Sequence, residues 1–164
     1  MKENKIRQRH EIPEEDKWAI EDLYATDEAW EAELATLAED QAYLAAFAGQ
    51  LGESAQKLYD YLVCNEQVNA KAELLGNYCV RKGDEDTRNG TYQAMGGKFM
   101  SVVVALSAAV SFETPEIMAI PDEKLDAFYA EKPELERYRR YLTNMRRMKE
   151  HVLSPAEEKL LAAA

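Results

Sequence analysis

Cysteine, histidine, glycine and proline are all scarce in this chain of 164 residues, which has two cysteines, two histidines, seven glycines and five prolines. So few glycines and prolines leave little room for flexible linkers, and a content of 46% hydrophobic and 31% charged residues is typical of a folded globular domain. Cys64 and Cys79 fall within one expected helix, about 22 Å apart along its axis, and cannot bridge each other there. We interpret both as buried small hydrophobes.

Basic residues and long apolar runs are scarce as well. The chain has 20 lysines and arginines against 31 acidic residues, a formal charge of −11. This balance argues against a nucleic-acid partner or an anionic membrane surface, because both require an excess of positive charge. The first ten residues are polar and charged, and no uninterrupted run of 18 apolar residues occurs. We therefore expect neither a secretory signal nor a membrane span, and a cytoplasmic location.

The basic residues that are present gather late in the chain. Residues 1–60 hold 15 acidic and 6 basic side chains, whereas residues 134–151 hold three acidic and six basic ones. The basic side chains of the second segment are Arg137, Arg139, Arg140, Arg146, Arg147 and Lys149. They could hold a phosphate or a carboxylate. A solvated face with ion pairs to the acidic front half is favoured instead, because a helix would spread them around its axis.

Apolar residues recur every three or four positions, which predicts an all-α fold without strands. The first long helix is expected from the N-cap Thr26 to Gly49, and the second from the N-cap Ser54 to Gly83. A third helix follows the polar loop 84–89, and a last one is expected from Glu134 to about Glu150. The apolar stripes of these four helices are Trp30, Leu34, Leu37, Leu44 and Ala48; Leu58, Leu62, Val68, Ala72, Leu75 and Cys79; Tyr92, Met95, Phe99, Val102, Leu106 and Ala109; and Leu135, Tyr138, Leu142 and Met145.

Two features of the third helix affect its expected position. Residues 99–110 are apolar nearly all round, which predicts a central helix with Val103, Leu106 and Val110 buried between at least two others. Gly96 and Gly97 lower its helix propensity by about 1 kcal/mol each relative to alanine. Close helix packing or a kink explains them better than a hinge or the approach of a ligand to the backbone.

These elements predict an antiparallel bundle of long helices with three parts. Residues 1–25 form a mostly irregular arm, because Pro13 blocks a continuous helix there, and residues 26–153 form the helical domain. Pro115 and Pro121 each restart a short helical piece, the second with an apolar face at Leu125, Phe128 and Tyr129. Ser154, Pro155 and Glu157 then begin a helix that reaches residue 164 without a stop signal. We expect this to be the start of a helix that continues into the missing part of a longer protein.

No motif in the sequence assembles a catalytic or metal site. His10 and Glu11 open a His-Glu-x-x-His pattern, but position 14 is glutamate and Pro13 breaks the required helix. His151 stands alone, and the cysteines have no histidine near them in sequence. The glycines match no phosphate-binding loop, and the acidic runs 14–16 and 84–86 match no calcium loop. The sequence therefore predicts no catalytic residue and no metal ligand, and assigns no substrate-binding residue.

Several stretches nevertheless resemble the oligoendopeptidase F family of zinc oligopeptidases. The opening Arg9-His10-Glu11-Ile12-Pro13 is followed by Trp18-Ala19-Ile20-Glu21-Asp22-Leu23-Tyr24. Residues 112–119 and the element Leu153-Ser154-Pro155-Ala156-Glu157-Glu158 continue the family pattern in the same order. Together these stretches cover nearly the whole chain, which therefore looks like the N-terminal portion of a family member.

The resemblance implies the helical lobe of a larger all-α metallopeptidase, which helps to wall a deep cavity where short peptides are cut by zinc-activated water. The family's zinc-binding histidines would lie far beyond position 164, so the full-length protein would carry zinc while this chain binds none and is inactive alone. The implied partners are the missing C-terminal catalytic domain and oligopeptide substrates, and uncovered Leu160 and Leu161 would cause weak self-association. The alternative is a free-standing helical protein-interaction module without catalysis.

Overall fold

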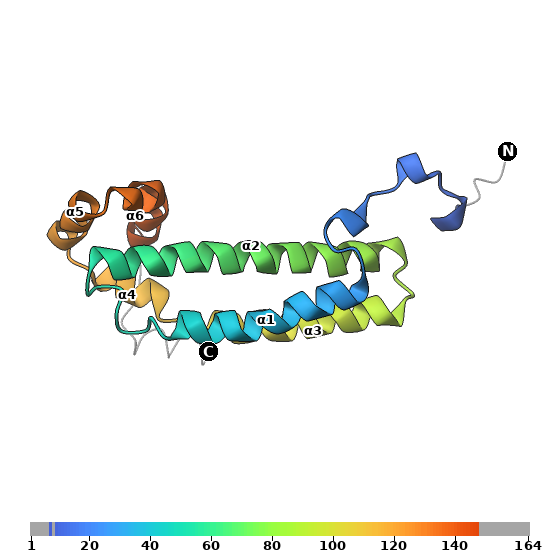
Figure 1. Ribbon diagram of the computed structural model, residues 1–164, viewed down its shortest axis with the longest axis horizontal. Coiled ribbons are helices and arrows are strands. Elements are labelled where there is room, and N and C mark those ends of the chain that lie inside the picture. Colours follow the sequence, from blue (N-terminus) through green and yellow to red (C-terminus); the bar gives the residue numbers. More distant parts are fainter. Residues whose placement is uncertain (1–6, 8, 148–164) are drawn as a thin grey trace, which may run out of the picture. The chain divides into compact units, whose positions relative to one another are not determined.

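The computed structural model describes Arg7 and residues 9–147 (Figure 1). Within these residues all regular secondary structure is helical, which confirms the predicted all-α class. The chain divides into two compact units, the first made of residues 1–43 and 65–109 and the second of residues 44–64 and 110–164. Helix α2 (Ala55–Glu85) contributes residues to both units. The predicted helix at 154–164, with its cap and with Leu160 and Leu161, lies outside the described residues.

The described residues of the N-terminal arm form short turns joined by irregular segments. The arm contains the short 3-10 turns η1 (Arg9–Glu11), η2 (Glu14–Asp16) and η3 (Ile20–Asp22). Ile20 is buried, whereas the Trp18 side chain is 66% exposed. The Arg81 guanidinium lies 5.3 Å from the centre of the Trp18 ring, so a cation–π contact holds the arm against α2.

The first unit packs α1 (Asp27–Ala45), α3 (Gly90–Ala109) and the later part of α2 together. The Thr26 hydroxyl accepts the Ala29 N–H at 3.2 Å, which confirms the predicted N-cap. Tyr78 donates to Asp27 at 2.8 Å and Lys71 donates to Asp40 at 2.6 Å. Residue numbers therefore increase along α1 while those of the contacting residues in α2 decrease, so these two helices are antiparallel.

The prediction that the third helix is buried on every side is wrong. Only Met95 and Leu106 of α3 are buried, whereas Val103 is half-buried and the Met100 and Val104 side chains are 57% and 63% exposed. One side of α3 packs within the first unit, with the Phe99 ring close to Gly76 of α2. The other side is apolar and exposed, and no described residue covers it. The prediction failed because periodicity indicates which faces of a helix are apolar but not what covers them.

The segment Gly90–Ala119 is long and apolar enough to cross a membrane by length and composition alone. Core helices of soluble proteins also pass this test, and such helices are mostly buried. Here only 11% of the most apolar 18-residue stretch of Gly90–Ala119 is buried. The segment is not one continuous helix, since a turn at residues 110–112 separates α3 from α4 (Glu113–Ala119). The exposure of α3 is therefore the feature that needs an explanation.

The second unit contains the short elements of the chain. After α4 come α5 (Asp122–Glu131), the 3-10 segment η4 (Pro133–Tyr138) and α6 (Arg139–Arg147). The Ser54 hydroxyl accepts the Lys57 N–H at 3.2 Å, which confirms the second predicted N-cap. The largest fully buried side chains of this unit are Leu44, Leu51, Leu58, Tyr61, Ile117, Leu135 and Leu142.

The last predicted helix differs from the observed one at its start. Instead of an α-helix from Glu134, the segment begins as η4 and becomes α-helical only at Arg139. The Leu135 N–H bonds the Lys132 carbonyl oxygen three residues back, and Pro133 offers no N–H for a longer-range bond. Leu135, Tyr138 and Leu142 of the predicted stripe are buried, while Met145 is half-buried. Residues 148–150 lie outside the described part.

Candidate functional site

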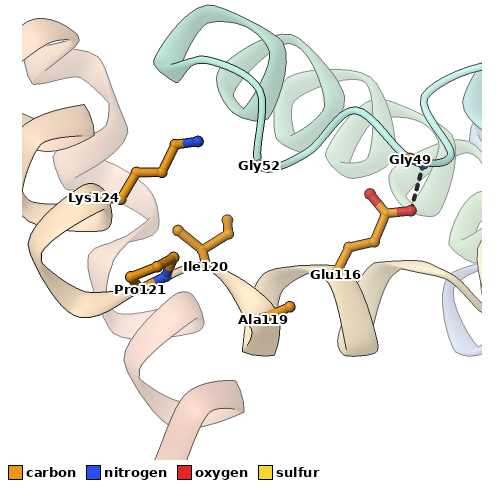
Figure 2. Close-up of a pocket in the computed structure, with 7 residues that line it drawn as sticks. All are labelled: Gly49, Gly52, Glu116, Ala119, Ile120, Pro121 and Lys124. Carbon is orange, nitrogen blue, oxygen red and sulfur yellow. Dashed lines mark hydrogen bonds between the residues drawn. The ribbon is translucent and has the colours of Figure 1, made fainter.

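Helix α4 is tied to the loop between α1 and α2 by the carboxylate of Glu116. One carboxylate oxygen accepts the Gly49 N–H at 2.5 Å (Figure 2). The other accepts the Leu51 N–H at 3.2 Å. Gly49 has a φ of +82°, a conformation that glycine adopts with little strain. This turn aims two backbone donors at a single carboxylate, and hydrogen bonds to a charged acceptor are the stronger kind.

A hollow of about 280 Å³ lies beside this contact. It is lined by Gly49, Gly52, Glu116, Ala119, Ile120, Pro121 and Lys124. Figure 2 shows Lys124 projecting from α5 on the side of the hollow away from Glu116. Ile120 and Pro121 supply an apolar wall, and Lys124 supplies one cation. The hollow offers room for a small group, while its one carboxylate already accepts two N–H groups.

A second carboxylate of α4, that of Glu113, is 8% exposed and faces tyrosines of the same unit. It accepts the Tyr141 hydroxyl at 2.6 Å. Burial, followed by the nearby Glu113 charge, raises the pKa of Tyr61. Burial and the Glu113 hydrogen bond raise the pKa of Tyr141. The buried Tyr61 hydroxyl has no hydrogen-bond partner among the described residues, and its ring packs 5.6 Å from that of Phe112.

The carboxyl end of α4 is held by Arg146. Its guanidinium donates to the Ile117 carbonyl oxygen at 2.8 Å and to the Ile120 carbonyl oxygen at 2.6 Å, and also pairs with Asp122. These bonds satisfy carbonyl groups that a helix end leaves without partners. Only 11% of the Arg146 side chain is exposed. Arg146 is therefore a structural clamp on α4.

Arg139 also has local partners. It pairs with Glu136 at 2.5 Å, and its guanidinium lies 3.8 Å from the centre of the Tyr129 ring. Arg139 and Arg146 both line a hollow of about 450 Å³ between α5 and α6. The prediction that the basic segment forms ion pairs with the acidic front half is wrong for Arg139 and Arg146. These two arginines pair instead with Glu136 and Asp122 of their own unit. Lys149 lies outside the described residues.

No catalytic constellation is visible in the part of the chain that the structure describes. His10 lies in η1, three positions before Pro13, and no group of three or more His, Cys, Asp or Glu in the described ranges could hold a metal. Cys79 is a buried thiol whose pKa is raised by burial, and Cys64 is half-buried. The absence of a catalytic residue in this chain stays a prediction, as does the absence of a metal ligand.

The interactions of Glu113 and Glu116 were missed by sequence reasoning. Both residues lie in the segment 112–119, which carried part of the family resemblance, and that was the one available signal. Their partners are far away in sequence, since Glu116 and Gly49 are 67 positions apart. Periodicity assigns residues to faces of a helix and cannot pair a carboxylate with a distant loop.

Comparison with known proteins identifies relatives along almost the whole chain. The sequence model of the family described as Oligopeptidase F matches residues 116–164. Oligopeptidase PepF of Bacillus subtilis is 34% identical over 163 residues, which are 99% of this chain and 24% of the relative. Group B oligopeptidase PepB of Streptococcus agalactiae is 31% identical over 95% of this chain and 26% of the relative. The chain thus spans about a quarter of the length of these curated relatives.

Solved structures agree with the sequence matches. The crystal structure of oligoendopeptidase-F from Enterococcus faecium superposes with a TM-score of 0.71 at 30% identity, covering 84% of this chain and 27% of the other. A putative peptidase from Chlamydophila abortus gives a TM-score of 0.81 over 97% of this chain and 27% of its own, at 24% identity, which supports the fold alone.

Fold and matches together define an all-helical N-terminal domain of a peptidase. The chain belongs to the oligoendopeptidase F family, as its residue patterns predicted, and it corresponds to the N-terminal quarter of its relatives.

Proposed function

We propose that this domain serves a zinc endopeptidase that hydrolyses oligopeptides, and that it helps to wall the cavity in which the peptide is cut. The supporting observation is that the curated relatives, named as oligopeptidases or oligoendopeptidases, align with 91–99% of this chain through only 24–26% of their own length. When bound in such an enzyme, zinc polarises the scissile carbonyl and lowers the pKa of a water molecule. The groups for that chemistry would come from the part of the enzyme beyond its N-terminal quarter.

The role of this chain in the proposal is structural. Glu116 ties α4 to the loop after α1, and Glu113 and Arg146 tie it to α6. The second unit therefore offers a fixed surface with two hollows. Such a surface suits the wall of a cavity, because a wall must keep its shape while peptides enter and leave. The proposal includes a cytoplasmic location.

A chimera tests this function. Residues 1–164 replace the matching quarter of Bacillus subtilis oligopeptidase PepF, and cleavage of quenched fluorescent oligopeptides is measured with and without a chelator. The expected result is chelator-sensitive cleavage by the chimera and zinc in the purified protein. The 164-residue protein alone should cleave no peptide and bind no stoichiometric zinc, because three protein ligands are needed for a catalytic site.

The control is the same Bacillus subtilis protein with its N-terminal quarter deleted. A folded chimera that is no more active than this deletion variant would contradict the proposed role and favour a free-standing interaction module. Chelator-sensitive cleavage by homogeneous 164-residue protein would contradict the proposal that this chain is inactive alone.

A further inference from the structure

One face of α3 is exposed and carries no charge. It consists of Gly97, Met100, Ser101, Val104 and Ala108, which follow one another at helical spacing and are all exposed; we call it the α3 face. The one charged residue of α3, Lys98, pairs with Glu31 of α1 and so belongs to a neighbouring face. In a protein with 31% charged residues, an uncharged exposed face of this length is unusual, and such patches commonly mark interfaces.

The other side of α3 is already occupied within the first unit. Phe99 packs against Gly76, while Met95 and Leu106 are buried. The helix is therefore fixed along one side by α1 and α2, which expose charged side chains of their own. A helix in this position cannot be surrounded by lipid without also burying those charges, which is costly. A polypeptide partner that covers only the α3 face avoids this cost.

The glycines of α3 point to a close approach from outside. An added Cβ atom would meet nothing within 4 Å at Gly96 or at Gly97. Close packing was the favoured explanation of these glycines from the sequence, yet no neighbour in the described residues requires them. Glycine inside a helix weakens it, and it lets another backbone approach closely. The partner that would use this approach lies outside the described chain.

We propose that the α3 face is the surface against which the part of an oligoendopeptidase F beyond its N-terminal quarter packs. This inference rests on the proposed function. The relatives extend well past the matched region, since this chain covers 24–27% of them, so they contain the polypeptide needed to cover the face. An uncharged face of small and apolar residues suits a closely packed apolar partner within one protein.

Two cysteine variants test the inference. Val104→Cys places a thiol on the α3 face, and Val80→Cys places one on α2 at a similar exposure, 63% and 50% for the native side chains. Each variant is prepared in the 164-residue protein and in the chimera with Bacillus subtilis oligopeptidase PepF. Labelling by a maleimide is followed by tandem mass spectrometry of peptides, whose fragment ions distinguish the new thiols from Cys64 and from Cys79, the neighbour of position 80.

The expected result is a loss of labelling specific to one face. Val104→Cys should react at least about tenfold more slowly in the chimera than in the 164-residue protein, because a packed interface must open before the reagent can enter. Val80→Cys should react at similar rates in both. Equal rates for Val104→Cys in the two proteins would overturn the inference. So would slowing of Val104→Cys in the 164-residue protein as its concentration rises, or on adding phosphatidylglycerol vesicles, since a second copy or a membrane would then cover the face.

The readouts separate this inference from the proposed function. An active chimera with an unprotected Val104→Cys thiol rejects the inference alone, and an inactive chimera with a protected thiol rejects the function alone. If the chimera does not fold, the same pair of cysteines is placed at the aligned positions of full-length Enterococcus faecium oligoendopeptidase-F, which has been crystallised. Equal labelling rates of the two cysteines in that folded protein, measured first in the native protein and again after unfolding and refolding, would also overturn the inference.

Discussion

The indole N–H of Trp30 donates a hydrogen bond to the backbone carbonyl oxygen of Leu75 at 2.8 Å, across 45 positions of sequence. Both side chains are fully buried in the first unit. The contact joins α1 to α2 through a side chain that supplies both apolar area and a polar donor. It therefore fixes the register of the two helices more specifically than apolar packing alone.

We expect Trp30→Phe to lower the free energy of unfolding by about 2 to 3 kcal/mol, because the variant loses the hydrogen bond and leaves unfilled volume. Urea denaturation measures the change. Trp18→Phe is the matched control, since Trp18 is 66% exposed and a phenylalanine ring can still face Arg81. The control should stay within about 0.5 kcal/mol of wild type. Equal losses for both variants would show that the Leu75 contact contributes nothing specific.

Glu116→Gln should weaken the contact between α4 and the loop after α1. The amide keeps one acceptor oxygen, so one of the Gly49 and Leu51 N–H groups loses its partner. We expect a loss of about 0.5 to 1.5 kcal/mol in unfolding free energy, the usual net contribution of one hydrogen bond, because the Gly49 contact is exposed and the Leu51 contact is partly buried. Glu53→Gln, an exposed carboxylate of the same unit, is the control and should be near neutral. Hydrogen exchange at Gly49 and Leu51 should accelerate in the first variant only.

The stability of the protein should decrease in alkali. Burial, followed by the hydrogen bond to Asp27 and its charge, raises the pKa of Tyr78 above its ordinary value of 10.0. A pKa that is higher in the folded state means that the folded form holds the proton more tightly. This contribution is therefore complete below about pH 10 and is lost as pH rises further. The hydrogen bond to Asp40 raises the pKa of Lys71 and acts in the same direction.

Tyr78→Phe isolates this effect. The variant should be less stable near neutral pH by about 1 kcal/mol, because it lacks the hydroxyl bond to Asp27. Its stability should fall less steeply above about pH 10 than that of the wild type. Urea midpoints measured across this pH range give both quantities. Tyr43→Phe, at a side chain that is 60% exposed, is the control and should follow the wild-type curve.

The sequence was sufficient for the long helices of this fold. Thr26 and Ser54 cap α1 and α2 as predicted, because N-cap side chains bond backbone groups only three residues away. Local bonds of this kind can be recognised in the sequence itself. The change from η4 to α6 was missed, although Pro133 was visible, since a proline at a helix start is compatible with both helix types.

The candidate site was far less accessible from the sequence. The bonds of Glu116 to Gly49 and of Arg146 to Ile117 join segments that are separated by 67 and 29 positions. Acidic and basic residues are normally solvated, so nothing local distinguishes these two from their neighbours. The exposure of Val104 was missed for a different reason: a helix that is apolar nearly all round is predicted to be buried, but its own sequence does not contain the partner that would bury it.

Leu106 and Val104 give a direct test of this distinction on a single helix. Leu106 is 7% exposed, so Leu106→Ala should lower the unfolding free energy by about 2 to 5 kcal/mol. Val104 is 63% exposed, so Val104→Ala should change it by less than about 0.5 kcal/mol in the 164-residue protein. Urea denaturation distinguishes the two. A loss below about 1 kcal/mol for Leu106→Ala would place that side chain on a surface.

Gly97 and Gly76 should respond in opposite ways to the same substitution. Gly97→Ala should raise the unfolding free energy of the 164-residue protein by about 0.5 to 1 kcal/mol, because alanine favours the helix and its Cβ meets nothing within 4 Å. Gly76→Ala should give no such gain, since its Cβ would lie 2.8 Å from the Phe99 ring and force that side chain to move. Thermal and urea unfolding measure both variants. Destabilisation by Gly97→Ala would show that the α3 face is already packed in this protein. Stabilisation would mean that no packing contact within the 164-residue protein requires glycine at position 97.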